Sequence, residues 1–280
     1  MQIFLSNSPV RSPQFFPFHH RISKTLINHL PIQIRTTHAT AASAMKGRAY
    51  RVAPLQVRRK ILEVEGHSIE GVSIGGQETS VILPGLNCAF DIGTCPIGAI
   101  HQDFVFITNA HPDHIGGLPM YLASRGLYNL KPAKVFVPYC IKDDVEKLLD
   151  IHRTMGQVEL NVDLVALDVG DPFEIRNDLV VRTFKTHHVI PSQGYVLYSI
   201  REKLNKQYDD LKDKPKEIEE LMKSGVKIND TIISPEIAFT GDTTTDFMLD
   251  PDNEDALRAK VLITEATFLD ESHSVDHARQ

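Results

Sequence analysis

Thr108-Asn109-Ala110-His111-Pro112-Asp113-His114-Ile115-Gly116-Gly117 is the stretch that decides the fold. It follows an apolar run at 104–108 and precedes a segment with helical spacing at 118–125, so its polar side chains emerge at the carboxyl end of a strand. Imidazole and carboxylate groups two and three residues apart on a tight turn can converge on one or two zinc ions. Gly116-Gly117 lets the backbone turn closely past such a site. One alternative stays open here: Asp113 could instead cap the following helix.

Three further segments place a potential ligand or supporting group after an apolar strand. His187 and His188 end one strand, and because successive strand residues face opposite ways, at most one of them should be a ligand. Histidine at a strand end is also commonly a surface residue. Asp242 follows the next strand and is equally suited to cap a helix, and Glu265 repeats the arrangement. Four such strand ends together indicate one shared site, since open α/β layers place their sites there.

The pattern of elements predicts a layered α/β sandwich. Short runs bounded by Gly and Pro near the start of the body favour antiparallel pairing, and strands alternate with helices later. The predicted helices are 118–125, stopped by Gly126, then 142–155, and one near 244–257. The predicted strands are 61–64, 69–74, 79–83, 88–92, 104–108, 133–137, 158–167, 179–186, 194–200, 236–240 and 260–264.

Composition narrows the protein class. The 280 residues are 42% hydrophobic, enough for a real core, and no apolar run approaches the ~20 residues that span a bilayer. Cys88, Cys95 and Cys140 form neither a disulfide framework nor a CxxC zinc motif. Residues 1–62 contain ten Lys and Arg and no Asp or Glu, a charge of +10, so the remainder carries −16. An acidic body argues against a broad basic groove for nucleic acid.

Residues 1–45 have the composition of an organellar transit peptide. Basic residues are spread among Ser, Thr and apolar residues without any acid, and prolines interrupt any apolar stretch that a secretory signal would need. Plentiful Ser and Thr favour the chloroplast, with the mitochondrion second. We expect this extension to be disordered and the mature chain to begin between Ala39 and Lys46, leaving 46–280 as the folded domain. The alternative is a disordered tail without a targeting role.

Four motifs give the body a family resemblance. They are HPDHIGGLPMYLASRG (111–126), HVIPSQGY (188–195), FTGDTTTDF (239–247) and ITEATFLDE (263–271). From about residue 50 to its end, the chain resembles the metallo-β-lactamase superfamily and, within it, short-form tRNase Z, the zinc endonuclease that trims 3′ trailers from precursor tRNA. The resemblance implies an α/β fold, the αββα sandwich, with its second half incomplete at the C-terminus.

The resemblance also implies roles for particular residues. Asp113 would orient or deprotonate the attacking water, and Glu265 would support a later histidine that protonates the leaving ribose oxygen. The product would be a tRNA with a free 3′-hydroxyl. Two zinc ions would be held by His111 and His188, by Asp113 and His114, and by Asp242 as the bridge.

Two departures from the family pattern lower the expected activity. Asn109 stands where the family has histidine, and a neutral amide is a poor zinc ligand beside imidazole, so the first zinc should bind weakly. The sequence given also ends before two further family histidines, and His273 and His277 lie too early in the pattern to take their roles. We therefore expect this chain to be weak or inactive.

The segment Arg201–Asp230 carries eight basic and eight acidic residues between the His188 and Asp242 motifs. On composition alone it is a solvated helical hairpin broken at Pro215. The resemblance implies an arm that grips the tRNA elbow, in a homodimer where each arm serves the other subunit's site. The candidate phosphate contacts are Lys203, Lys206, Lys212, Lys214 and Lys216.

Two other functions remain open on sequence grounds. One is a non-catalytic tRNA-binding protein or dimer partner. The other is a small-molecule hydrolase similar to glyoxalase II. Nucleophile elbows of the GxSxG type and phosphate-binding loops of the GxxxxGK[ST] type are absent from the sequence.

Overall fold

The computed structural model describes residues 2–5, 60–212 and 214–266. The expected start of the mature chain, between Ala39 and Lys46, and the histidines His273 and His277 lie outside the described residues. Among the helices that the structure describes, none has the length and apolar character to span a membrane.

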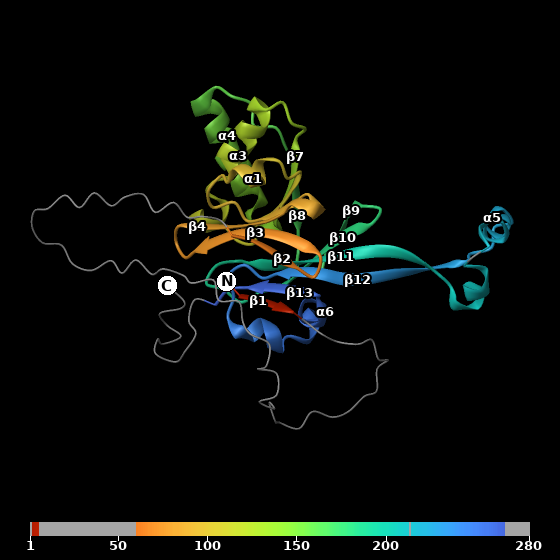
Figure 1. Ribbon diagram of the computed structural model, residues 1–280. Coiled ribbons are helices and arrows are strands. Elements are labelled where there is room, and N and C mark those ends of the chain that lie inside the picture. The colour runs from red at the N-terminus through yellow and green to blue at the C-terminus, as the bar shows by residue number, and fades with distance from the viewer. Residues whose placement is uncertain (1, 6–59, 213, 267–280) are drawn as a thin grey trace, which may run out of the picture.

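Two β-sheets lie face to face and enclose the central core (Figure 1). In this core Phe90 of one sheet stacks on Phe239 of the other, with ring centroids 4.9 Å apart. The first sheet contains, in spatial order, β2 (Lys60–Val64), β3 (His67–Ile74), β4 (Glu78–Leu83), β5 (Cys88–Phe90), β6 (Phe104–Phe106), β7 (Ala133–Pro138) and β8 (Val162–Leu167). The second contains β1 (Gln2–Leu5), β13 (Val261–Thr264), β12 (Asn229–Phe239), β11 (Gln193–Leu204), β10 (Leu179–Lys185) and β9 (Pro172–Arg176).

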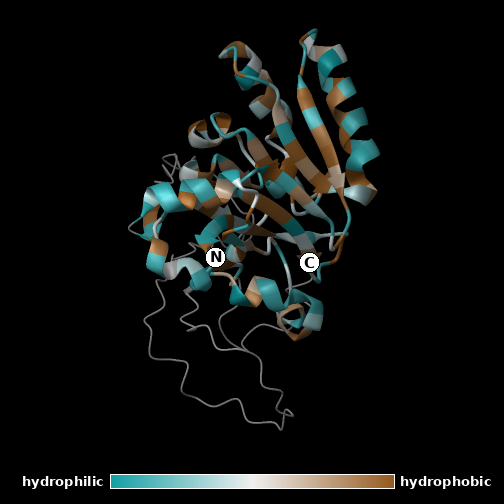
Figure 2. Ribbon diagram, turned by 90° about the vertical axis from the view of Figure 1, so that its right-hand side faces the viewer, coloured by the Kyte–Doolittle hydropathy of each residue, from teal (hydrophilic) through white to brown (hydrophobic). Residues whose placement is uncertain are grey.

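Helices cover the outer face of each sheet, so the predicted αββα sandwich is confirmed. Brown apolar residues concentrate on the strands and teal polar residues on the outer helices (Figure 2). On the first sheet lie α1 (Ile97–Ile100), α2 (Pro112–Ile115), α3 (Leu118–Leu127) and α4 (Lys142–Gly156), besides the short 3-10 turn Tyr139–Ile141; a further 3-10 turn, Pro84–Leu86, connects β4 to β5. On the second lie α6 (Glu254–Arg258) and the 3-10 turns η5 (Thr245–Leu249) and η6 (Pro251–Asn253).

Pairing directions match the sequence pattern. Strands β2 to β5 pair antiparallel, as the short Gly- and Pro-bounded runs predicted, and β5 to β8 pair parallel. The parallel strands point their carboxyl ends to one edge. The loop that follows β6 at this edge is the histidine-rich stretch, so the fold presents it where sites of α/β proteins form.

Several predicted boundaries were wrong for local reasons. The helix α3 continues through Gly126, because Tyr128 N still donates to Ser124 O at 3.0 Å. Strand β8 begins at Val162 instead of 158, since Leu160 packs into the core beneath the helices. The expected helix at 244–257 is two 3-10 turns followed by α6.

Gln2–Leu5 forms the edge strand β1, which pairs antiparallel with β13 (Figure 1). This departs, at these four residues, from the expectation of a disordered extension. Strand β13 pairs with β12 along one edge, and β1 satisfies the backbone donors and acceptors of its other edge.

An arm extends from the body between β11 and β12. Beyond Ser199 these two strands pair only with each other and run outward as a ribbon to α5 (Pro215–Lys223), preceded by the 3-10 helix η4 (Lys206–Leu211) (Figure 1). The arm therefore includes strand ribbon as well as helix. Pro215 was expected to break a helix, but it is the first residue of α5. The N–H groups of the first helical turn have no partner within the helix, so the missing N–H of proline loses no hydrogen bond there.

Candidate metal centre

The segments after three strands meet at one place. The loop after β6 brings His111, the segment after β10 brings His188, and the turn after β12 brings Asp242. Ligand atoms of these three side chains all lie within 4.8 Å of one another. Their donor set is two imidazole nitrogens and one carboxylate oxygen.

The distances within this group are short. His188 Nε2 lies 3.0 Å from His111 Nδ1 and 3.7 Å from Asp242 Oδ2. Of the adjacent histidines only His188 enters the group, as strand alternation predicted. His187 is tied through its backbone instead: its N–H donates to Thr243 Oγ1 at 3.0 Å.

A second group adjoins the first through Asp242. His114 Nε2 lies 3.1 Å from Asp242 Oδ2 and 3.7 Å from Asp113 Oδ2. Asp113 also accepts a hydrogen bond from the backbone N–H of Gly76, at 2.8 Å, in the turn between β3 and β4. All five predicted ligands thus form one continuous cluster.

Neither carboxylate acts as a helix cap, the alternative that the sequence left open. The N-cap of α2 is His111, and Asp113 lies inside the first turn with its side chain directed to Gly76. The N-cap of η5 is Thr244, whose side chain accepts from Asp246 N. Both carboxylates are therefore available to the cluster.

Sequence reasoning missed Asp91, a fully buried carboxylate at the end of β5. Asp91 Oδ2 lies 2.8 Å from His114 Nδ1 and accepts a hydrogen bond from Thr108 Oγ1, also at 2.8 Å. A carboxylate on the far nitrogen of a histidine fixes the ring and its tautomer, as at metal-bound histidines generally. The sequence did contain a signal, a carboxylate after an apolar strand, but 23 residues separate it from its partner.

The charges of this cluster are strongly coupled. Burial by itself would lower the pKa of His114, but the carboxylates of Asp91 and Asp242 outweigh it and raise that pKa to about 11. Burial would raise the pKa of Asp242, but the hydrogen bond and charge of His114 hold it below its usual value. The pocket is therefore built to hold positive charge.

The donor set and this charge fit a metal ion. His114 Nε2 is buried and makes no hydrogen bond of good geometry among the described residues, although Asp242 lies close by. Imidazole nitrogens grouped with carboxylate oxygens are the donor set that Zn²⁺ prefers.

Asn109, which stands where the resemblance expects histidine, is fully buried. Its Oδ1 accepts the backbone N–H of His111 at 2.8 Å, and its backbone forms a bridge with Ser192. Asn109 therefore shapes the loop that presents His111.

Glu265 and two glycines shape the surrounding loops. Glu265 Oε1 accepts the backbone N–H of Thr243, directly after Asp242, so Glu265 supports the Asp242 turn. Gly241 has φ +62, and a Cβ there would lie 2.5 Å from Thr108 Oγ1. A Cβ on Gly117 would lie 2.3 Å from Thr94 O, which agrees with the expected close backbone turn.

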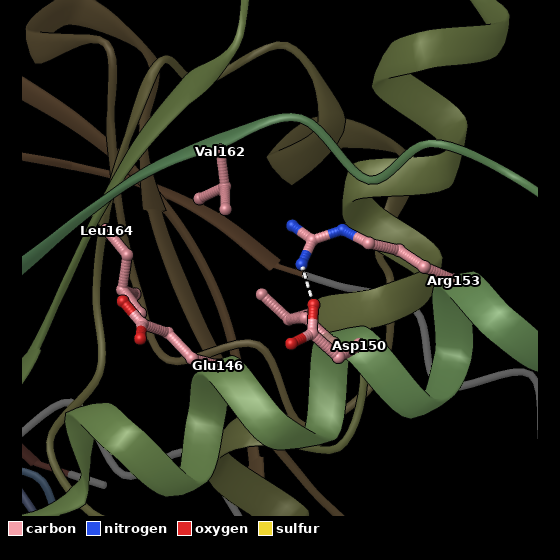
Figure 3. A pocket seen from close by; sticks show the side chains of 6 residues that line it. Glu146, Asp150, Arg153, Val162 and Leu164 are labelled. Atoms are coloured by element: carbon pink, nitrogen blue, oxygen red, sulfur yellow. Dashed lines mark hydrogen bonds and ion pairs between the residues drawn. The ribbon is translucent and has the colours of Figure 1, made fainter.

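A shallow pocket between α4 and β8 lies apart from this cluster (Figure 3). Arg153 Nη1 pairs there with Asp150 Oδ1 at 2.6 Å. The pocket contains no residue of the metal cluster. Its lining is Glu146, Leu149, Asp150, Arg153, Val162 and Leu164.

Comparison with known proteins shows the family to which the chain is similar. Residues 96–279 match the model of the beta-lactamase superfamily domain. The chain is 60% identical to "tRNase Z TRZ2, chloroplastic" of Arabidopsis thaliana, over 98% of this chain and 81% of that protein. It is 57% identical to "tRNase Z TRZ1" of the same plant, over 79% of each chain. It is also 57% identical to "Nuclear ribonuclease Z" of Triticum aestivum, over 61% of this chain and 96% of that one.

Proposed function

The chain belongs to the tRNase Z family of the beta-lactamase superfamily, endoribonucleases that process the 3′ ends of tRNA, and we propose that it removes 3′ trailers from precursor tRNA with zinc at the centre described above. The observation on which this depends is the convergence of His111, His188 and Asp242 within 4.8 Å, with His114 and Asp113 adjoining. The family membership leaves the small-molecule hydrolase alternative without support.

The five side chains divide into two sets of ligands. His111 and His188 would hold one zinc, Asp113 and His114 the other, and Asp242 would contact both. Zinc bound there would act as a Lewis acid on the scissile phosphate. It would also lower the pKa of water, so that hydroxide is available as the nucleophile near neutral pH.

The protein's own groups would orient the reactants. The Gly76 N–H holds one oxygen of Asp113 in place, which leaves the carboxylate's remaining acceptor positions to orient the attacking water or take its proton. Asp91 keeps the His114 ring directed toward Asp242. Glu265 keeps the Asp242 turn in position through Thr243 N.

We propose weak activity on account of Asn109. Its amide oxygen is already engaged by His111 N, so the first zinc set has three protein ligands instead of the four that histidine would complete.

The arm would contact the tRNA backbone. Its five candidate lysines are all exposed. Lys214 Nζ forms an ion pair with Glu217 Oε1 at 3.3 Å. Lysines on a projecting arm can contact phosphates of a structured RNA. Such contacts recognise the shape of the RNA more than its base sequence. They are Lys203 in β11, Lys206 in η4, Lys212 and Lys214 in the connection, and Lys216 in α5.

We also propose the homodimer. Four large apolar side chains are exposed together on the neighbouring helices α1 and α3 and directly after α3, which suits a self-complementary interface. Their exposed fractions are 76% for Ile97, 62% for Met120, 77% for Leu127 and 53% for Tyr128.

Residues 1–45 are proposed as a chloroplast transit peptide. Their acid-free basic composition and the chloroplastic name of the Arabidopsis relative support this location. The comparisons give the mitochondrion no support. Import of a reporter fused behind residues 1–45 into isolated chloroplasts measures the targeting directly.

Cleavage and metal content together test the function. The purified chain should bind zinc and cut a precursor tRNA carrying a 3′ trailer to leave a free 3′-hydroxyl. Asp242→Asn should lose zinc affinity by at least about tenfold and most of the cleavage, because it removes the carboxylate shared by both sets. The matched control, Asp252→Asn at an exposed carboxylate of η6, should change neither. RNA binding without cleavage at full zinc occupancy would favour the non-catalytic alternative.

A further inference from the structure

Glu236 is a buried carboxylate outside the metal centre that the proposed reaction does not use. It lies in β12, and its side chain is 3% exposed. Strand pairing shifts between Leu197 and Tyr198, so that Ile237 and Pro235 find partners while Glu236 is the extra residue of a β-bulge. Bulges re-aim a side chain locally, and this one directs a carboxylate into the protein.

This bulge lies where the arm leaves the body. Strand β11 pairs with β10 as far as Ser199, and β12 pairs with β13 from Ile237 onward. Past these points neither strand pairs with a third strand of the described chain, and the two are joined to each other at Ile200–Leu204 and Asn229–Ile233. An isolated two-stranded ribbon is marginally stable and twists easily, so its direction must be set at its base.

Glu236 connects every element at that base. It accepts hydrogen bonds from Lys260 Nζ at 2.9 and 2.7 Å and from Ser199 Oγ at 2.6 Å. Arg201 Nη2 of the ribbon lies 3.4 Å away, and His67 Nε2 of β3, in the opposite sheet, lies 3.6 Å away. One carboxylate thus joins the ribbon, the segment before β13 and the other sheet.

We propose that Glu236 is the positioning residue that fixes the direction of the arm, and thereby the distance between the arm's RNA-contacting end and the metal centre. The five ribbon residues after Ser199 span roughly 17 Å, so a small rotation at the base becomes a displacement of several ångströms at the tip. The consequence for RNA rests on the proposed function of the arm, whereas the anchoring of the ribbon does not.

Two measurements on the full-length protein test the anchoring of the ribbon and its effect on RNA binding separately. Glu236→Gln keeps the size of the side chain and removes its charge. Hydrogen exchange of the amides in Ile200–Leu204 and Asn229–Ile233 should become at least about tenfold faster, while amides of β7 stay unchanged. The KM for precursor tRNA should rise by roughly tenfold, the equivalent of one lost charge-assisted contact, with kcat for bis(p-nitrophenyl) phosphate unchanged.

Controls keep the test decisive. Glu254→Gln, an exposed carboxylate of α6 paired with Arg258, should alter neither readout. Should Glu236→Gln fail to fold, Ser199→Ala removes one hydrogen bond of the same base and should loosen the ribbon in the same direction. Faster ribbon exchange with an unchanged KM supports the anchor and counts against the arm's role in binding tRNA. Ribbon exchange equal to that of the wild type overturns the proposal.

Discussion

Asp91, His114 and Asp242 form a line of alternating charge through the centre. The imidazole lies between two carboxylates, 2.8 and 3.1 Å away, and these hold its pKa at about 11. In the absence of a metal, a proton on His114 supplies the positive charge that the carboxylates require. Metal binding at Nε2 must displace that proton, so zinc affinity should be coupled to pH at this residue.

The Asn109→His substitution tests how much zinc affinity is lowered by the asparagine that stands in place of the family histidine. We expect zinc affinity of the His111 and His188 set to rise by at least about tenfold, and precursor tRNA cleavage to rise with it, because an imidazole replaces an amide beside two other imidazoles. Competition with a chromogenic zinc chelator measures the affinity. Asn177→His, at an exposed turn between β9 and β10, is the matched control. An affinity equal to that of the wild type would mean that Asn109 does not limit the site.

At the scale of elements, the centre depends on where strands end and how tightly the loops cross. The β6 loop, the β12 turn and the β3–β4 turn meet at the cluster, and the Gly76 N–H contacts Asp113 across 37 residues of sequence. Gly241 lets the Asp242 turn approach Thr108 more closely than any residue with a Cβ would. The ligands are therefore placed by sheet edges, which are more rigid than long loops.

The arm's lysines should determine the salt dependence of tRNA binding. Changing Lys203, Lys206, Lys212, Lys214 and Lys216 to Ala together should weaken binding and flatten the plot of log affinity against log salt. Each lost phosphate contact removes about 0.7–0.9 from the slope. Filter binding or anisotropy at several salt concentrations measures this.

A body lysine provides the comparison for the arm. Lys147→Ala on α4 removes one lysine charge outside the arm and should leave the slope nearly unchanged, whereas each single arm lysine changed to Ala should lower it. If the five-lysine variant keeps the affinity and slope of the wild type, the arm does not contact RNA phosphates.

At the scale of the whole molecule, the outer helices α1 and α3 expose large apolar side chains. Leu127→Glu should convert the proposed dimer to a monomer, because it places a charge among the exposed apolar side chains of the proposed interface. Light scattering after size exclusion measures the mass, which should halve. Val169→Glu, at an exposed apolar residue of the turn before β9, should leave the mass unchanged. A wild-type chain that is already monomeric contradicts the proposal.

The sequence alone was sufficient for most of the strands, the layered sandwich and the family, because apolar periodicity and short motifs are local properties; it missed β1 and β9. The segments after the strands indicated where the site lies, and the family resemblance supplied the five residues that the structure brings together in one cluster. Boundaries were less predictable: a glycine at 126 is tolerated in the last turn of α3, and Pro215 starts a helix where it was expected to break one.

Only the tertiary structure decided what each polar group contacts. It assigned Asp113 and Asp242 to the cluster instead of to helix caps, paired Asp91 with His114, and gathered Lys260, Ser199 and His67 around Glu236. These contacts join residues that are distant in sequence, and they depend on strand register, a bulge and the packing of two sheets. Hydrogen bonds and ion pairs need their atoms placed to within a fraction of an ångström, and no local pattern of residues specifies positions at that precision.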